Sequence, residues 1–139
     1  MATRAPRASG ARSERCRCPG CVAGLTPFTV PHFRVYCAEL VLDSLKLMVL
    51  EPFQALVASD LFAGIPEIWE VIPEGNGKTT FWAAMGLYHC EHRSAAFVPI
   101  AASSRDQAET YYRQAEAFVE NTPRLKKLFD AQAGYRRIR

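Results

Sequence analysis

The residues of this 139-residue chain whose types and spacing most clearly suggest chemistry form one glycine-containing run. It consists of Gly75, Asn76, Gly77, Lys78, Thr79 and Thr80. Glycines have no side-chain bulk, so successive backbone N–H groups of such a loop can surround the phosphates of a nucleotide. Lys78 would reach the β- and γ-phosphate oxygens, and Thr79 would offer its hydroxyl to the Mg²⁺ that accompanies ATP. The run therefore predicts a phosphate-binding loop.

A phosphate loop of this kind must be positioned by a buried strand before it and a helix after it. Residues 68–72 form a short apolar run between two prolines and predict the strand, and residues 79–91 predict the helix. Residues 95–102 predict a second strand, although Pro99 would remove one of its ladder hydrogen bonds, and residues 105–120 predict a second helix. This order implies a right-handed crossover onto a parallel sheet with flanking helices. The expected fold class is α/β, an incomplete P-loop NTPase fold.

The chain before the loop predicts fewer and shorter elements. Residues 1–27 are rich in Arg, Ala, Gly and Pro and show no hydrophobic period, so we expect a disordered basic, cysteine-containing arm. The following pattern predicts a short helix over residues 31–42, a strand over 45–50 and a helix over 52–62. Beyond the loop and its two predicted helices, Thr122 followed by proline predicts the start of a further helix.

The net charge of +3 is unevenly distributed, because residues 1–17 contribute +4 and leave −1 for the rest. A near-neutral body gives no general electrostatic footprint for nucleic acid. Local basic side chains near the C-terminus could contact DNA or form a solvated face: Arg124, Lys126, Lys127, Arg136, Arg137 and Arg139. No apolar run is long enough to cross a membrane, and an odd number of cysteines favours a reducing compartment, so we expect a cytoplasmic protein.

Three of the five cysteines form a C-x-C-x-x-C pattern at Cys16, Cys18 and Cys21. Thiolates and imidazole are the usual ligands of structural zinc, and either Cys37 or His32 could supply a fourth ligand. Structural zinc sites usually show two paired ligand sets, and only one is present here. Zinc binding and unpaired tail thiols therefore both remain open readings.

Three runs in order resemble the N-terminal part of the ATPase domain of a phage terminase large subunit. They are residues 51–54 (EPFQ), 72–80 (IPEGNGKTT) and 101–108 (AASSRDQA). The resemblance spans residues 28–139 and implies part of the motor that moves viral DNA into a capsid in the host cytoplasm. It implies ATP and Mg²⁺ as cofactors, and viral DNA, the terminase small subunit and the portal as partners.

Within this resemblance, Gln54 matches a glutamine that recognises adenine, and Lys78 and Thr79 match catalytic residues. Gln54 could equally be a polar residue on the outer face of its helix. Ile72 stands where the standard loop has glycine, as is usual in that family, whereas Glu74 replaces a residue that is usually basic. Hydrolysis needs carboxylates that hold Mg²⁺ and position water, and no apolar run ending in acidic residues follows residue 108. We therefore expect an ATP-binding fragment that does not hydrolyse ATP alone, such as a truncated reading frame, one piece of a split gene or a prophage remnant. A second chain could complete the ATPase.

Two other functions compete with this interpretation. One is a zinc-binding or protein-interaction module with a decayed phosphate loop. The other is a different small P-loop NTPase or kinase, which should carry a complete catalytic set within its single domain.

Overall fold

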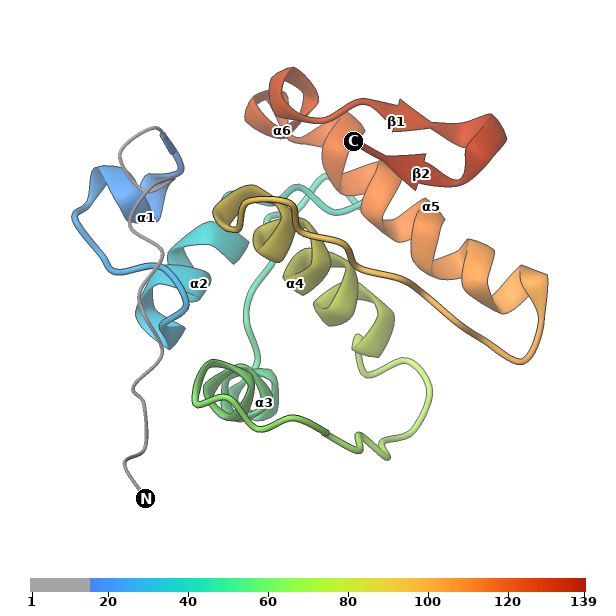
Figure 1. Ribbon diagram of the computed structural model, residues 1–139, viewed down its shortest axis with the longest axis horizontal. Helices are drawn as coiled ribbons and strands as arrows, with labels where there is room; N and C mark the ends of the chain where they lie inside the picture. Colours follow the sequence, from blue (N-terminus) through green and yellow to red (C-terminus); the bar gives the residue numbers. More distant parts are fainter. Residues whose placement is uncertain (1–15) are drawn as a thin grey trace.

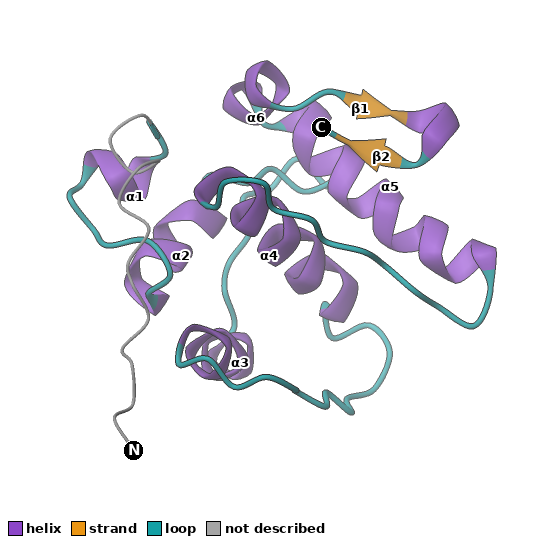
Figure 2. Cartoon of the chain, in the orientation of Figure 1, coloured by secondary structure: helices purple, strands orange, loops and turns teal. Residues whose placement is uncertain are grey.

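The computed structural model describes residues 16–139, and helices dominate this part of the chain (Figures 1 and 2). The helices are α1 (Pro19–Val22), α2 (Val30–Cys37), α3 (Pro52–Phe62), α4 (Lys78–His92), α5 (Arg105–Asn121) and α6 (Pro123–Leu128). After α6 the chain forms strand β1 (Ala131–Gln132), a 3-10 turn (Ala133–Tyr135) and strand β2 (Arg137–Ile138).

Local sequence signals account for where these helices begin. Proline occupies the first turn of α2, α3 and α6, where its missing N–H costs no helical hydrogen bond. Ser104 caps α5 by accepting a hydrogen bond from the backbone N–H of Gln107 at 3.3 Å. The predicted helices over 52–62, 79–91 and 105–120 are therefore confirmed to within one residue at each end, and Pro123 begins a further helix as expected.

The core lies around α4, which is the central helix of Figure 1. Phe81 and Tyr88 on α4 are fully buried, and their rings contact Phe33 of α2. On another face α4 packs directly against α5, where a Cβ atom on Gly86 would lie 2.8 Å from the Tyr111 hydroxyl. Glycine at this position is what allows the two helices to approach so closely.

The expected parallel sheet is absent from the described residues, so the α/β prediction of a P-loop NTPase fold is wrong. The only sheet in residues 16–139 is the antiparallel pair β1–β2, with Ala131 opposite Ile138. Residues 68–72 and 95–102, both predicted as strands, form neither strand nor helix.

Packing explains this difference. A strand of a parallel sheet needs backbone partners and apolar cover on both faces, but Val71 is 90% exposed and Phe97 is 83% exposed. Residues 96–100 instead border a groove of about 780 Å³ that they share with α4, α5 and the C-terminal hairpin. Because α4 contacts α5 directly, these two helices do not flank a sheet between them.

Three smaller expectations also change. The arm expected to be disordered contains α1 and a buried Cys18 within residues 16–27, whereas residues 1–15 lie outside the described part. The helix expected over 31–42 covers only Val30–Cys37, and the strand expected over 45–50 is reduced to a single bridge between Val41 and Leu47. Among residues 16–139, no helix has both the length and the apolar character needed to cross a bilayer.

Two phenylalanine substitutions distinguish this fold from the expected one. Phe118→Ala removes a fully buried ring and should lower the free energy of unfolding by about 3–5 kcal/mol. Phe97→Ala removes an exposed ring and should change that free energy by no more than about 0.5 kcal/mol. Urea unfolding monitored by circular dichroism measures both, and a Phe97→Ala cost as large as that of Phe118→Ala would show that residues 95–102 are buried.

Candidate metal centre and phosphate loop

The predicted phosphate loop joins an irregular segment to the start of α4. Gly75 and Gly77 have φ angles of +80° and +75°, in the left-handed region that residues with a Cβ rarely adopt. A Cβ on Gly77 would also approach the side-chain amide nitrogen of Gln54 at 3.2 Å. Both glycines of the motif are therefore needed by the backbone path of this loop.

Lys78 is folded back over the loop. Its ammonium group donates hydrogen bonds to the carbonyl oxygens of Ile72 at 2.5 Å and Pro73 at 2.9 Å. Asn76 donates from its side-chain amide to the same Pro73 carbonyl at 3.2 Å. The cation is thus held at the loop by neutral carbonyl groups, while the Glu74 side chain is exposed nearby in sequence.

The first turn of α4 keeps donors available. Gly77 is the N-cap residue and makes no side-chain capping hydrogen bond, so no side chain of the cap satisfies the first N–H groups of this 15-residue helix. Thr79 and Thr80 are half-buried in that turn, and the Thr80 hydroxyl lies 3.5 Å from the Gln114 amide oxygen on α5. The loop, the cation and these N–H groups together form the local geometry that favours an anion.

Gln54 lies beside this loop and is only 3% exposed. Its amide oxygen accepts a hydrogen bond from the Glu51 backbone N–H at 3.0 Å, and its amide nitrogen donates to the Gly77 carbonyl at 3.4 Å. The structure therefore brings Gln54 and the glycine loop together, and the burial of Gln54 rules out a position on the outer face of the helix. In this arrangement its amide joins the start of α3 to Gly77, the N-cap residue of α4.

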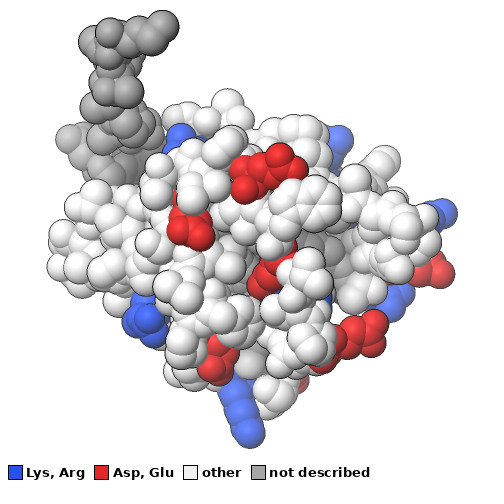
Figure 3. All heavy atoms as spheres, turned by 90° about the horizontal axis from the view of Figure 1, so that it is seen from below, with Lys and Arg blue, Asp and Glu red and all other residues white. Residues whose placement is uncertain are grey.

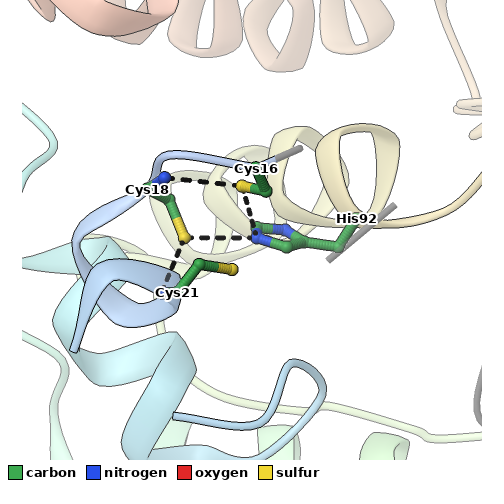
Figure 4. A group of neighbouring side chains, drawn as sticks. All are labelled: Cys16, Cys18, Cys21 and His92. Carbon is green, nitrogen blue, oxygen red and sulfur yellow. Dashed lines mark hydrogen bonds between the residues drawn. The ribbon is translucent and has the colours of Figure 1, made fainter. Parts of the chain in front are cut away.

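A second group of chemically active side chains lies at the other end of α4. Cys16, Cys18, Cys21 and His92 each offer one ligand atom, and the four atoms lie within 4.8 Å of one another. The His92 Nε2 atom is 3.5 Å from the Cys16 sulfur and 3.4 Å from the Cys18 sulfur. Figure 4 shows the three sulfur atoms and this nitrogen directed toward a common point. Three thiols and one imidazole are a set of ligands that binds zinc in proteins.

Of the two residues considered from the sequence as a fourth ligand, only His32 reaches this cluster. Its Nε2 atom lies 3.6 Å from the Cys18 sulfur and 3.3 Å from the Cys21 sulfur, while Cys37 is buried in the hydrophobic core. His92 was missed because it lies 71 residues beyond Cys21, outside any local motif. Only the folding of the arm onto the last turn of α4 brings it to the thiols.

The turn that carries the thiols packs closely against the His32 ring. A Cβ on Gly20 would lie 2.7 Å from the His32 Cδ2 atom, so glycine allows this approach. Burial, and then the nearby His92, lower the pKa of His32 to about 4. His32 is therefore a neutral imidazole at pH 7, with one ring nitrogen a donor and the other an acceptor.

A partly buried ion-pair network adjoins the cluster. The Arg124 guanidinium donates to Glu39 at 2.7 Å and to Glu91 at 2.6 Å, and the Cys16 thiol donates to the same Glu91 oxygen at 3.0 Å. Burial opposes the charge of Arg124, but its hydrogen bonds to the two carboxylates raise its pKa above the ordinary value. For Cys16, the hydrogen bond with Cys18 and then burial raise the pKa of the thiol in the absence of a metal ion.

This network also bears on the basic residues near the C-terminus that could contact DNA. Arg124, Lys126 and Arg136 each pair with a carboxylate, on Glu91, Glu120 and Glu109 respectively. Half of the six basic side chains are therefore already engaged within the molecule. On the face seen in Figure 3, lysine and arginine side chains are scattered at the edge and do not gather into one patch.

Removal of Arg124 should be costly because it leaves two carboxylates without their counter-charge. Arg124→Met should lower the free energy of unfolding by about 3–5 kcal/mol, since the Glu91 side chain is only 4% exposed. Lys126→Met breaks an exposed pair and should cost no more than about 0.5 kcal/mol. Thermal unfolding of both variants tests this, and equal small losses would show that the Glu91 network contributes little.

Comparison with known protein families, curated proteins and solved structures finds no match for the chain. The assignment of both candidate sites therefore rests on the residues, the distances and the burial described above.

Proposed function

We propose that residues 73–80 bind the phosphates of ATP and that the chain serves as an ATP-binding part of a viral DNA-packaging motor. The observation that carries the proposal is the loop itself: two glycines with positive φ lead directly into a long helix whose first residue is Lys78. Phosphate binding of this kind depends on backbone N–H groups and a local cation, and it does not require a sheet within the described residues.

The hydrogen bonds of the Lys78 side chain support this proposal. Its ammonium group is held by two carbonyl oxygens, and no carboxylate among the described residues pairs with it. A phosphate group entering the loop would replace these neutral acceptors with negatively charged oxygens, which attract the ammonium group more strongly. Lys78 can therefore exchange its present partners for a ligand without leaving a buried ion pair broken.

The same geometry suggests that ATP is bound but not hydrolysed by this chain alone. Thr79 can offer its hydroxyl to Mg²⁺, but no carboxylate in residues 16–139 forms a hydrogen bond with Thr79 or Lys78. The exposed Glu74 beside the loop also opposes negatively charged phosphates. We expect weak binding, with a second chain supplying the acidic groups that turnover requires.

The proposed role in DNA packaging rests on the resemblance of three sequence runs to phage terminase large subunits. That role would place the chain in the host cytoplasm, with viral DNA, the terminase small subunit and the portal as partners. Two of these runs meet in the folded chain, since Gln54 of residues 51–54 contacts Gly77 of residues 72–80. The third run, residues 101–108, leads into α5, which contacts α4.

Thermal unfolding with Mg-ATP tests the phosphate loop. A ligand that binds only the folded state, at about ten times its dissociation constant, stabilises by about 1.4 kcal/mol and should raise the melting temperature by several degrees. Lys78→Ala should abolish this rise because it removes the cation at the loop. Lys127→Ala, which changes an exposed lysine of α6, should keep it.

Two results would contradict the proposal. One is a cooperative unfolding transition of the unmodified chain that Mg-ATP does not move. The other is a rise in melting temperature that persists unchanged in Lys78→Ala, which would place the nucleotide elsewhere.

A further inference from the structure

We propose that Cys16, Cys18, Cys21 and His92 bind one Zn²⁺ ion in a closed tetrahedral site that joins the N-terminal arm, residues 16–27, to the end of α4. This site is separate from the phosphate loop, which lies at the opposite end of the same helix. It does not depend on whether the chain binds ATP.

The distances in the cluster agree with a zinc site. Zinc lies about 2.3 Å from sulfur and 2.0–2.1 Å from nitrogen, so the sulfur–nitrogen edge of a tetrahedral site measures about 3.5 Å. The His92 Nε2 atom lies 3.5 Å from the Cys16 sulfur and 3.4 Å from the Cys18 sulfur. All four ligand atoms also fall within 4.8 Å of one another.

Hydrogen bonding at the far side of the His92 ring prepares it as a ligand. Its Nδ1 atom lies 2.9 Å from the Tyr88 backbone carbonyl, which can only accept a hydrogen bond. In the neutral ring Nδ1 therefore carries the proton, and the lone pair of Nε2 faces the thiols. A backbone carbonyl that fixes the tautomer in this way is a common outer partner of a metal-bound histidine.

The surroundings of His32 favour a different role for this second imidazole. The Tyr88 hydroxyl accepts a hydrogen bond from the Phe28 N–H at 2.7 Å and lies 2.8 Å from the His32 Nδ1 atom. All three groups are satisfied when the hydroxyl O–H donates a hydrogen bond to the lone pair of Nδ1, so that the neutral His32 ring carries its own proton on Nε2. That N–H then points at the sulfurs of Cys18 and Cys21, so His32 acts as a hydrogen-bond donor to two metal ligands.

Backbone N–H groups also donate hydrogen bonds to two of the sulfur atoms. The Cys18 N–H donates to the Cys16 sulfur, and the Cys21 N–H donates to the Cys18 sulfur, each at 3.4 Å. Binding of Zn²⁺ forms three Zn–S bonds and one Zn–N bond, and the thiol protons are released to solvent. Glu91 beside Cys16 would repel the thiolate, but Arg124 binds the same Glu91 oxygen at 2.6 Å and offsets this charge.

Four protein ligands leave no open position for water or substrate, so the site is structural and not catalytic. The ion would link residues 16–21 to a residue more than 70 positions later in the chain. This is the type of long connection whose closure restricts the unfolded chain most. The zinc would therefore hold the arm on α4 and stabilise the fold.

Metal analysis of the full chain, purified without chelator, tests the site. We expect one zinc per chain, and X-ray absorption should show three sulfur ligands and one nitrogen ligand. Co²⁺ in place of zinc should give the intense visible absorption of a tetrahedral thiolate site. NMR of the cadmium-substituted chain should show scalar coupling from the metal to the ring of His92 and none to His32.

Matched substitutions separate the ligands from their neighbours. His92→Gln and Cys21→Ser each remove a ligand and should eliminate the tetrahedral Co²⁺ spectrum. His32→Gln removes an outer hydrogen bond and should weaken metal affinity about 10–100-fold while the spectrum remains. Cys37→Ser changes a buried thiol of the core and should leave the ligand set unchanged.

The proposal is overturned by any of three results on the unmodified chain. These are the absence of both bound zinc and a thiolate–Co²⁺ spectrum, a ligand shell with no nitrogen, and cadmium coupling to His32 in place of His92. These measurements need no variant, so a substitution that fails to fold does not affect the outcome.

Discussion

The position of Tyr88 on α4 is the constraint on which the aromatic core and the thiol cluster depend. Its ring packs against Phe33, Tyr36 and Phe62, and its hydroxyl accepts the Phe28 N–H at 2.7 Å. This bond fixes the segment that returns from the N-terminal arm to α2. The same residue orients both imidazoles of the thiol cluster, through its hydroxyl for His32 and its backbone carbonyl for His92.

Helix α4 then acts as a rigid connection between two different chemical environments. Its first residue is Lys78, at a glycine loop that favours anions, and its last is His92, among thiols that favour a soft cation. The helix itself is held by aromatic packing on one side and by α5 on the other, where Gly86 permits close contact. Each site is therefore positioned by the same buried element, although their ligands are unrelated.

Local signals in the sequence predicted α3, α4, α5 and the start of α6, because proline and capping serine act within a few residues of their own position. Phosphate binding at the glycine loop stays a prediction. The prediction of a parallel sheet was wrong because apolar runs such as residues 68–72 become strands only when distant segments of the chain pair with them. The two predicted strands, residues 68–72 and 95–102, instead have exposed side chains at Val71 and Phe97. Similarly, the C-x-C-x-x-C pattern left zinc binding open, but no spacing rule could add His92 to the cluster, since the fold alone brings it to Cys16 and Cys18.

Hydrogen exchange along the full chain most directly tests the claim that α4 carries separate sites at its two ends. With Zn²⁺ added, we predict slower exchange in residues 16–27 and in the last turn of α4. With Mg-ATP added instead, the slower exchange should appear in residues 73–80 and leave the arm unchanged. Protection that spreads equally over both ends with either ligand, or that appears at neither end, would contradict the account.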